Sequence, residues 1–153
     1  MLATPNVKQG NDSRFQYRTT LSNDVQEVSA LNEFVDGICE TLGLDMTTTM
    51  QMNLAIEEAV VNVMTYAYPA GVKGDVDIEA FADDKYLKIV IRDRGKAFDP
   101  TAQEEADTTL SAEERPIGGL GIHLVRQLMD TIDYRREDGL NVLTLCKKLN
   151  TNG

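Results

Sequence analysis

The feature that most constrains this chain is the second half of a predicted helix, residues 53–69, where one face carries an acid and an amide among apolar residues. Glu58 and Asn62 stand four residues apart, so both side chains lie on the same side of the helix. A carboxylate among apolar neighbours is costly unless it is paired, bound to a metal or protonated. The two side chains are therefore either a functional pair or part of a solvated helix edge.

Periodicity predicts the elements around this helix. Alternating apolar and polar residues predict five strands, at residues 14–21, 75–82, 86–92, 132–136 and 140–149. Apolar residues at helical spacing predict three helices, at 25–42, at 45–67 and from Gly118 onward. Turn signals join neighbouring strands, and helices with one apolar stripe must cover one face of a sheet. The predicted fold is an α+β two-layer sandwich, with a mixed and mainly antiparallel sheet covered on one face by helices.

The chain is predicted to form one domain. Its 153 residues are enough for one core and show no internal repeat. Residues 1–13 are polar and are predicted to be a flexible arm before a domain at 14–150. Residues 96–117 are acidic and lack periodicity, which is typical of a functional lid or a disordered insert.

Charge and cysteine content exclude several classes of function. A net charge of −10 repels phosphate backbones, so direct nucleic-acid binding is not expected, whereas a partner with a basic face is. Cys39 and Cys146 are predicted to be buried free thiols in preference to a disulfide, and two cysteines offer no metal-ligand cluster. No signal-peptide core or membrane span is visible, so a cytoplasmic protein is expected.

A second motif, IRDRGKAFDP at residues 91–100, comes directly after a predicted strand. Asp93 lies where the strand ends, and Gly95 permits a sharp turn or a close backbone approach. A carboxylate there is placed to accept a hydrogen bond from a ligand amine, such as that of adenine. The alternative is a loop aspartate that satisfies its own turn.

A third motif, GGLGIHL at residues 118–124, places glycines at the entrance to a helix. Backbone N–H groups at a helix N-terminus bind phosphate, and glycines let phosphates come close. The pattern is neither a Walker A motif nor a Rossmann fingerprint. The glycines are otherwise hinges, and Arg115 before them either meets a terminal phosphate or lies on the surface.

In this order, the three motifs resemble the GHKL ATPase superfamily, and most closely its small anti-sigma-factor serine/threonine kinases. The resemblance covers residues 14–149, and it implies the Bergerat-type ATP-binding fold. The chain departs from the family pattern at Tyr66, where the family often has histidine, and at Ala97, where it often has glycine or proline.

The resemblance implies specific roles. Glu58 matches the general base, Asn62 the Mg²⁺ ligand, and Asp93 the adenine-binding carboxylate, with Gly95 giving room for the base. The remaining positions matched to nucleotide binding are Arg115, Gly119, Leu120, Gly121 and Thr144. The sole histidine, His123, is interpreted as structural or solvent-facing.

The expected function is that of an ATP- and Mg²⁺-dependent protein serine/threonine kinase and anti-sigma-type regulator. Its expected protein substrate is a small anti-anti-sigma (STAS-type) protein, with a sigma factor as a second partner and a homodimer as the assembly. Two alternatives remain open. One is a non-catalytic ATP-binding module, and the other is a detached histidine-kinase catalytic domain.

Overall fold

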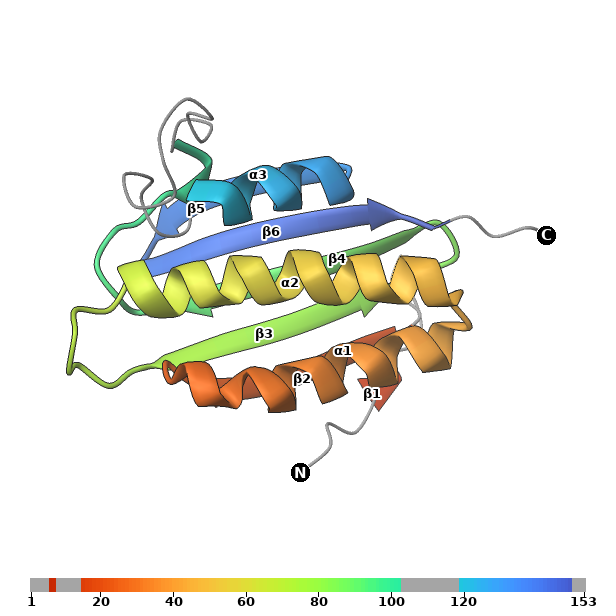
Figure 1. Ribbon diagram of the computed structural model, residues 1–153, viewed down its shortest axis with the longest axis horizontal. Coiled ribbons are helices and arrows are strands. Elements are labelled where there is room, and N and C mark those ends of the chain that lie inside the picture. The colour runs from red at the N-terminus through yellow and green to blue at the C-terminus, as the bar shows by residue number, and fades with distance from the viewer. Residues whose placement is uncertain (1–5, 8–14, 103–118, 150–153) are drawn as a thin grey trace.

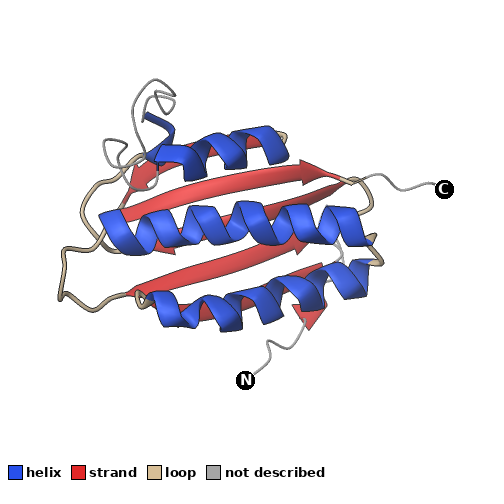
Figure 2. Ribbon diagram, in the orientation of Figure 1, coloured by secondary structure: helices blue, strands red, loops and turns tan. Residues whose placement is uncertain are grey.

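The computed structural model describes residues 6–7, 15–102 and 119–149 of the chain. In this part of the chain, helices and strands form two layers (Figure 1, Figure 2). The helices are α1 (Val28–Leu42), α2 (Met46–Tyr66) and α3 (Gly119–Leu128). The strands are β1 (Asn6–Val7), β2 (Phe15–Ser22), β3 (Asp75–Ala82), β4 (Tyr86–Asp93), β5 (Thr131–Glu137) and β6 (Leu140–Lys148).

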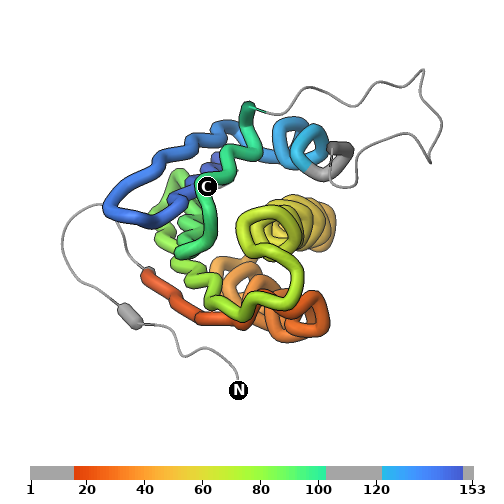
Figure 3. The backbone as a smooth tube through the Cα atoms, turned by 90° about the vertical axis from the view of Figure 1, so that its left-hand side faces the viewer, coloured from red at the N-terminus to blue at the C-terminus, as the bar shows by residue number. Residues whose placement is uncertain are grey.

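The strands form one sheet in the order β1-β2-β3-β4-β6-β5. All three helices lie on one face of this sheet, which the end-on view makes plain (Figure 3). This confirms the predicted α+β sandwich. Two details differ from the prediction. Every pairing among the described strands is antiparallel, so no part of that sheet is mixed. Asn6–Val7, within the predicted flexible arm, pairs with β2, because the β2 edge offers backbone groups that β3 leaves free.

The helix boundaries follow from capping residues. Asp45 caps α2 by accepting a hydrogen bond from the backbone N–H of Thr48 at 2.7 Å. Gly43 ends α1 with a φ of 69°, a left-handed conformation that glycine adopts at little cost. Asp24 caps a short 3₁₀ helix, Val25–Glu27, which leads into α1. These boundaries confirm the predicted starts and stops to within about three residues.

The two faces of the sheet differ as the alternation predicts. The face under the helices is apolar, and β3 buries every second side chain there, namely Val76, Ile78, Ala80 and Ala82. The opposite face is polar: Glu79 accepts hydrogen bonds from Gln16 at 2.6 Å and from Arg92 at 2.5 Å. The core therefore lies between the two layers.

Both cysteines are free in the structure, as predicted, but only one of the two is buried. Cys39 is buried in α1, and burial raises the pKa of its thiol to about 11. Cys146 is half-buried on β6. Within the described residues, none of the helices has the length and apolar character required to traverse a bilayer.

We expect Ile56→Ala to destabilise the fold strongly. Ile56 is 1% exposed on the core side of α2, and the cavity left by such a truncation costs about 2–5 kcal/mol of unfolding free energy. Leu54 is 41% exposed on the same helix, so Leu54→Ala is a matched control with an expected loss of roughly 0.5 kcal/mol. Urea unfolding followed by circular dichroism measures both. Equal losses would contradict the assignment of Ile56 to the core.

Candidate functional site

Asp93 ends β4 as a buried carboxylate, 2% exposed. Its Oδ1 accepts two hydrogen bonds, from the backbone N–H of Gly95 at 2.8 Å and from the side-chain Nδ2 of Asn141 at 2.9 Å. No hydrogen bond from the described residues reaches Oδ2. One oxygen therefore holds the turn, and the other is left for a ligand donor.

Burial sets the ionisation of Asp93. Desolvation raises the pKa of this carboxyl above its ordinary value. The hydrogen bond from Asn141, the backbone N–H of Gly95 and the charge of Arg136 act in the opposite direction. The two hydrogen bonds and the Arg136 charge thus stabilise the charged form, although burial outweighs them in the net shift of the pKa.

Gly95 lets the turn after β4 pack closely against the end of α2. A Cβ at this position would lie 2.3 Å from the carbonyl oxygen of Ala67, so the close approach requires glycine. The next residue, Lys96, donates its backbone N–H to the same carbonyl at 2.8 Å. This carbonyl is one that the helix end leaves without an intrahelical partner. The Asp93 turn and the C-terminus of α2 are therefore fixed to one another.

Asn141, on β6, is the residue of this site that sequence reasoning misses. It is directly opposite Asp93 in the β4–β6 register and is 3% exposed. Beyond its bond to Asp93, its Nδ2 donates to Lys96 O at 2.7 Å. Its Oδ1 accepts from Phe98 N at 3.2 Å and from the hydroxyl of Tyr134 at 2.5 Å. The signal that could have found Asn141 in the sequence is its spacing: it is a polar residue two and four positions before Leu143 and Leu145, which are buried on the same face of β6.

Thr144 does not join this site, which corrects the expectation from the sequence. Asn141, Leu143 and Leu145 point toward the helices, whereas Thr144 alternates to the other face of the sheet. It is paired with Val90 of β4, three positions from the pair formed by Asp93 and Asn141. An odd offset along a strand reverses the side-chain direction.

α2 carries Glu58 and Asn62 on the flank that faces α3. The opposite flank is marked by Asn53, whose side chain bonds Asn32 and Asp36 of α1. Asn62 lies roughly half a turn away around the helix, and α3 packs beside α2 (Figure 1). Asn62 is 3% exposed, and its Nδ2 donates to Glu58 O at 2.9 Å. Glu58 itself is half-buried.

The predicted glycine motif opens α3. Gly119 is the first residue of the helix, and Leu120 and Gly121 follow in its first turn. This end of α3 lies at the same end of the molecule as the C-terminus of α2 and the turn after β4 (Figure 1). Arg115 lies outside the described residues, so its phosphate contact stays a prediction. The structure thus brings the three motifs to one end of the helix layer.

The beginning of the predicted lid is described up to Ala102. Phe98 lies against Tyr66 with ring centroids 5.5 Å apart, which is packing between the lid and α2. Farther along, Arg126 of α3 donates a hydrogen bond to the carbonyl of Thr101. His123 is half-buried on α3, with its Nε2 3.2 Å from Gln127 Nε2.

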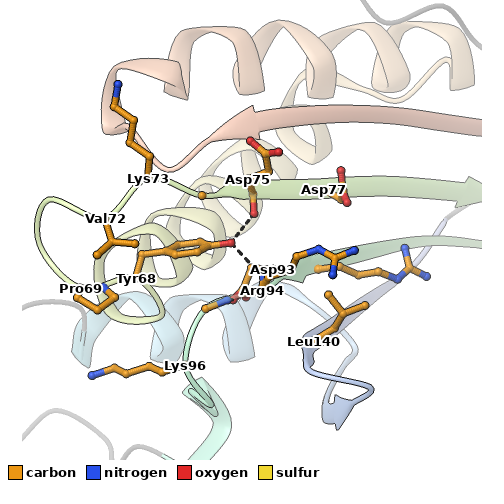
Figure 4. Close-up of a pocket in the computed structure, with 13 residues that line it drawn as sticks. Tyr68, Pro69, Val72, Lys73, Asp75, Asp77, Asp93, Arg94, Lys96 and Leu140 are labelled. Atoms are coloured by element: carbon orange, nitrogen blue, oxygen red, sulfur yellow. Dashed lines mark hydrogen bonds between the residues drawn. The ribbon is translucent and has the colours of Figure 1, made fainter.

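A cavity of about 730 Å³ opens beside the Asp93 turn (Figure 4). Tyr68 forms its wall, donating its hydroxyl to Asp75 O at 2.7 Å and accepting from Arg94 N at 3.0 Å. Gly74 permits this packing, because a Cβ there would lie 2.2 Å from the Tyr68 ring. The tyrosine therefore joins the start of β3 to the end of β4 and supports the turn from behind.

This cavity is a neighbour of the predicted site and not the site itself. Of the predicted residues, its lining includes Asp93 and Gly95, but neither Glu58 nor Asn62. Its other lining residues come from β3, β4, β6, the loop after α2 and the turn after β4. The α3-facing flank of α2, with Glu58 and Asn62, is thus a surface outside the lining of this cavity.

The fold and this arrangement define a nucleotide-binding class. The chain matches the histidine kinase-like ATPase domain over residues 21–147, and it belongs to this family, the GHKL ATPases. Similar relatives are named serine-protein kinase or serine/threonine-protein kinase, which confirms the predicted resemblance to this family.

Three relatives illustrate the similarity. Serine-protein kinase RsbW of Halalkalibacterium halodurans is 29% identical over 119 residues, which cover 75% of this chain and 72% of the relative. RsbW of Bacillus thuringiensis is 30% identical over 111 residues, covering 70% and 69%. Serine/threonine-protein kinase BtrW of Bordetella bronchiseptica is 30% identical over 94 residues, covering 61% and 66%.

We expect Asn141→Ala to weaken nucleotide binding as well as the fold. The change leaves Phe98 N and Lys96 O without their partner and removes one of the two bonds to Asp93, at a cost of about 1–3 kcal/mol in unfolding free energy. Titration with a fluorescent ATP analogue should show about tenfold weaker binding.

Asn32→Ala is the matched control for this experiment. Its amide joins α1 to α2 at Asn53, away from Asp93. We expect it to lower stability while leaving the dissociation constant for the analogue unchanged. Unaltered binding by Asn141→Ala would show that Asn141 serves the fold alone.

Proposed function

We propose that this protein is an ATP- and Mg²⁺-dependent serine/threonine kinase that acts as an anti-sigma-type regulator. The observation that carries the proposal is the α3-facing flank of α2, where Glu58 and the buried Asn62 stand one helical turn apart. Family membership supplies ATP as the nucleotide. The names of the relatives support transfer to serine or threonine.

In the proposed reaction, Glu58 orients the attacking hydroxyl and accepts its proton. The hydroxyl oxygen of the protein substrate forms a bond to the γ-phosphorus of ATP, the bond from that phosphorus to the β–γ bridging oxygen breaks, and ADP leaves. A positioned carboxylate is suited to this step, because phosphoryl transfer depends mainly on positioning and charge stabilisation. Half-burial of Glu58 keeps it within reach of a docking protein.

Asn62 is the residue that fits Mg²⁺. Its Nδ2 is engaged with Glu58 O, so its Oδ1 is the atom available to a hard cation. The described residues contain no group of three or more His, Cys, Asp or Glu side chains that could hold a metal alone. One amide oxygen fits an ion shared with phosphate oxygens. Bound in that way, Mg²⁺ neutralises phosphate charge during transfer.

Asp93 and the start of α3 complete the proposed nucleotide site. The free Oδ2 of Asp93 accepts the exocyclic amine of adenine, and Gly95 leaves the base room. The backbone N–H groups of Gly119 and Gly121 meet the phosphates, which lets a helix N-terminus bind the negative charge.

The proposed protein substrate is a serine or threonine of a small STAS-type anti-anti-sigma protein, with a sigma factor as the second partner. We further propose a homodimer in the cytoplasm. β1 pairs with β2 only at Phe15 and Gln16, so the rest of that β2 edge has no partner among the described strands. An unpaired strand edge is a surface through which two copies of a chain can associate.

The test is phosphate transfer from γ-labelled ATP, with Mg²⁺, to a panel of purified STAS-domain proteins. We expect Glu58→Gln to lower kcat by about 10²–10⁴-fold with ATP affinity retained, because only the proton acceptor is lost. We expect Asn62→Ala to lose the Mg²⁺-dependent part of ATP affinity. The adjacent acid provides the matched control, since Glu57→Gln should leave both properties intact.

Each other outcome identifies a different function. ATP binding without transfer to any panel protein would favour the non-catalytic module. A label found on histidine would favour the histidine-kinase alternative. Full transfer by Glu58→Gln would show that Glu58 is not the base.

A further inference from the structure

An exposed apolar ridge on α2 leads to Glu58. Met46 is 85% exposed, Met50 56% and Leu54 41%. The three stand at successive intervals of four residues, and side chains at that spacing are neighbours along a helix. The next two positions in the same row are Glu58 and Asn62, the pair placed in the proposed site. We call Met46, Met50 and Leu54 the docking ridge.

The fold gives no reason for the docking ridge to be apolar. The side of α2 that packs on the sheet is formed by other residues, among them Met52, Ile56 and Ala59. Single exposed apolar side chains are common, but a contiguous row marks an interaction surface. The other large apolar residues that the described chain exposes, Val25, Val72 and Tyr86, lie on three separate segments.

An acidic row on α1 borders the ridge. Glu33, Asp36 and Glu40 are exposed and stand three and four residues apart, so they share one face of α1. Asp36 lies at the contact with α2, because Asn53 Nδ2 donates to Asp36 Oδ1 at 2.7 Å, and Glu33 and Glu40 stand beside it on the exposed side of α1. We call Glu33, Asp36 and Glu40 the acidic row.

The charge of this helix pair is one-sided. Of the chain's 25 acidic residues, eight lie between Thr19 and Val72, and none of its 15 basic residues does. α1 and α2 thus contain no cation that offsets the acidic row. A partner that covers this surface must bring its own basic residues, which then also speed association.

Resting on the proposed kinase function, we propose that the docking ridge and the acidic row together bind the protein substrate. The complementary surface is an apolar patch bordered by lysine or arginine, beside the acceptor serine or threonine. A hydroxyl that reaches Glu58 belongs to a protein that must cover the neighbouring surface of α2. The docking ridge is the apolar surface beside Glu58, and the acidic row fixes the orientation of the bound protein substrate.

The test uses the STAS-domain protein that the wild-type chain phosphorylates best. We expect the double variant Met50→Gln, Leu54→Gln to raise the KM for this protein by about tenfold, with kcat changed less than about twofold. Glutamine retains length and helix propensity, so the fold is kept. The dissociation constant for ATP, measured by calorimetry, should not change. Tyr86→Gln, an exposed apolar residue on the sheet, is the control.

A second pair of variants tests the acidic row. The double variant Glu33→Lys, Glu40→Lys should raise the same KM and make it depend less on ionic strength. Salt weakens the wild-type attraction by screening, and the variant no longer has that attraction. Glu137→Lys, an exposed acid on β5, is the matched control and should leave KM and its salt dependence unchanged.

The outcomes separate this docking proposal from the proposed kinase function on which it rests. If the wild type phosphorylates no panel protein, the kinase proposal fails and the docking proposal fails with it. If it does, and the ridge and row variants keep the wild-type KM, only the docking proposal is wrong. A ridge variant that changes the oligomeric state in light scattering, with KM unaltered, would assign the ridge to a second copy of the chain instead.

Discussion

The buried hydrogen bond between Asp93 and Asn141 is the interaction on which the rest of this site depends. It joins the end of β4 to the start of β6, and the same amide holds the carbonyl of Lys96. Lys96 and Gly95 in turn rest on Ala67 at the end of α2. A carboxylate out of water is tolerated here because its Oδ1 is fully engaged. One acid therefore sets the position of the turn, the helix end and the entry to the lid.

α2 serves a different purpose on each of its sides. Its core side packs on the sheet, one flank is bonded to α1 through Asn53, and the opposite flank carries Glu58 and Asn62. The fourth side is open and carries the docking ridge. Charge is divided in a similar way, because the α1–α2 pair is purely acidic whereas the outer face of the sheet holds cations such as Arg18, Lys88 and Arg92. On the sheet, Arg18 and Arg92 are paired with Asp77 and Glu79, so the unbalanced negative charge lies on the helices.

The elements of this fold are predictable from the sequence because each shows its own periodicity and carries its own caps, as Asp45 and Gly43 do for the helices. Glu58 and Asn62 are visible for the same local reason, since a polar pair interrupts an apolar helix. The role of Asn141 is not visible, because it depends on the register between strands whose paired residues are 48 positions apart. The same register decides the face of Thr144. This residue is three positions from Asn141 along β6, so its side chain lies on the face of the sheet opposite to Asp93. Local sequence patterns predict the helices and strands, whereas side-chain contacts across the sheet can be predicted only when the strand pairing is known.

Calorimetric titration of ATP, with and without Mg²⁺, on the wild type and on Asp93→Asn tests the nucleotide site itself. We expect Mg²⁺-dependent binding by the wild type, and affinity at least about tenfold lower in the variant, because a charge-assisted hydrogen bond to the base is lost. Equal affinities would show that Asp93 supports the turn without contacting the nucleotide. A wild type that binds no ATP would contradict the nucleotide site and leave a GHKL fold that works through protein contacts alone.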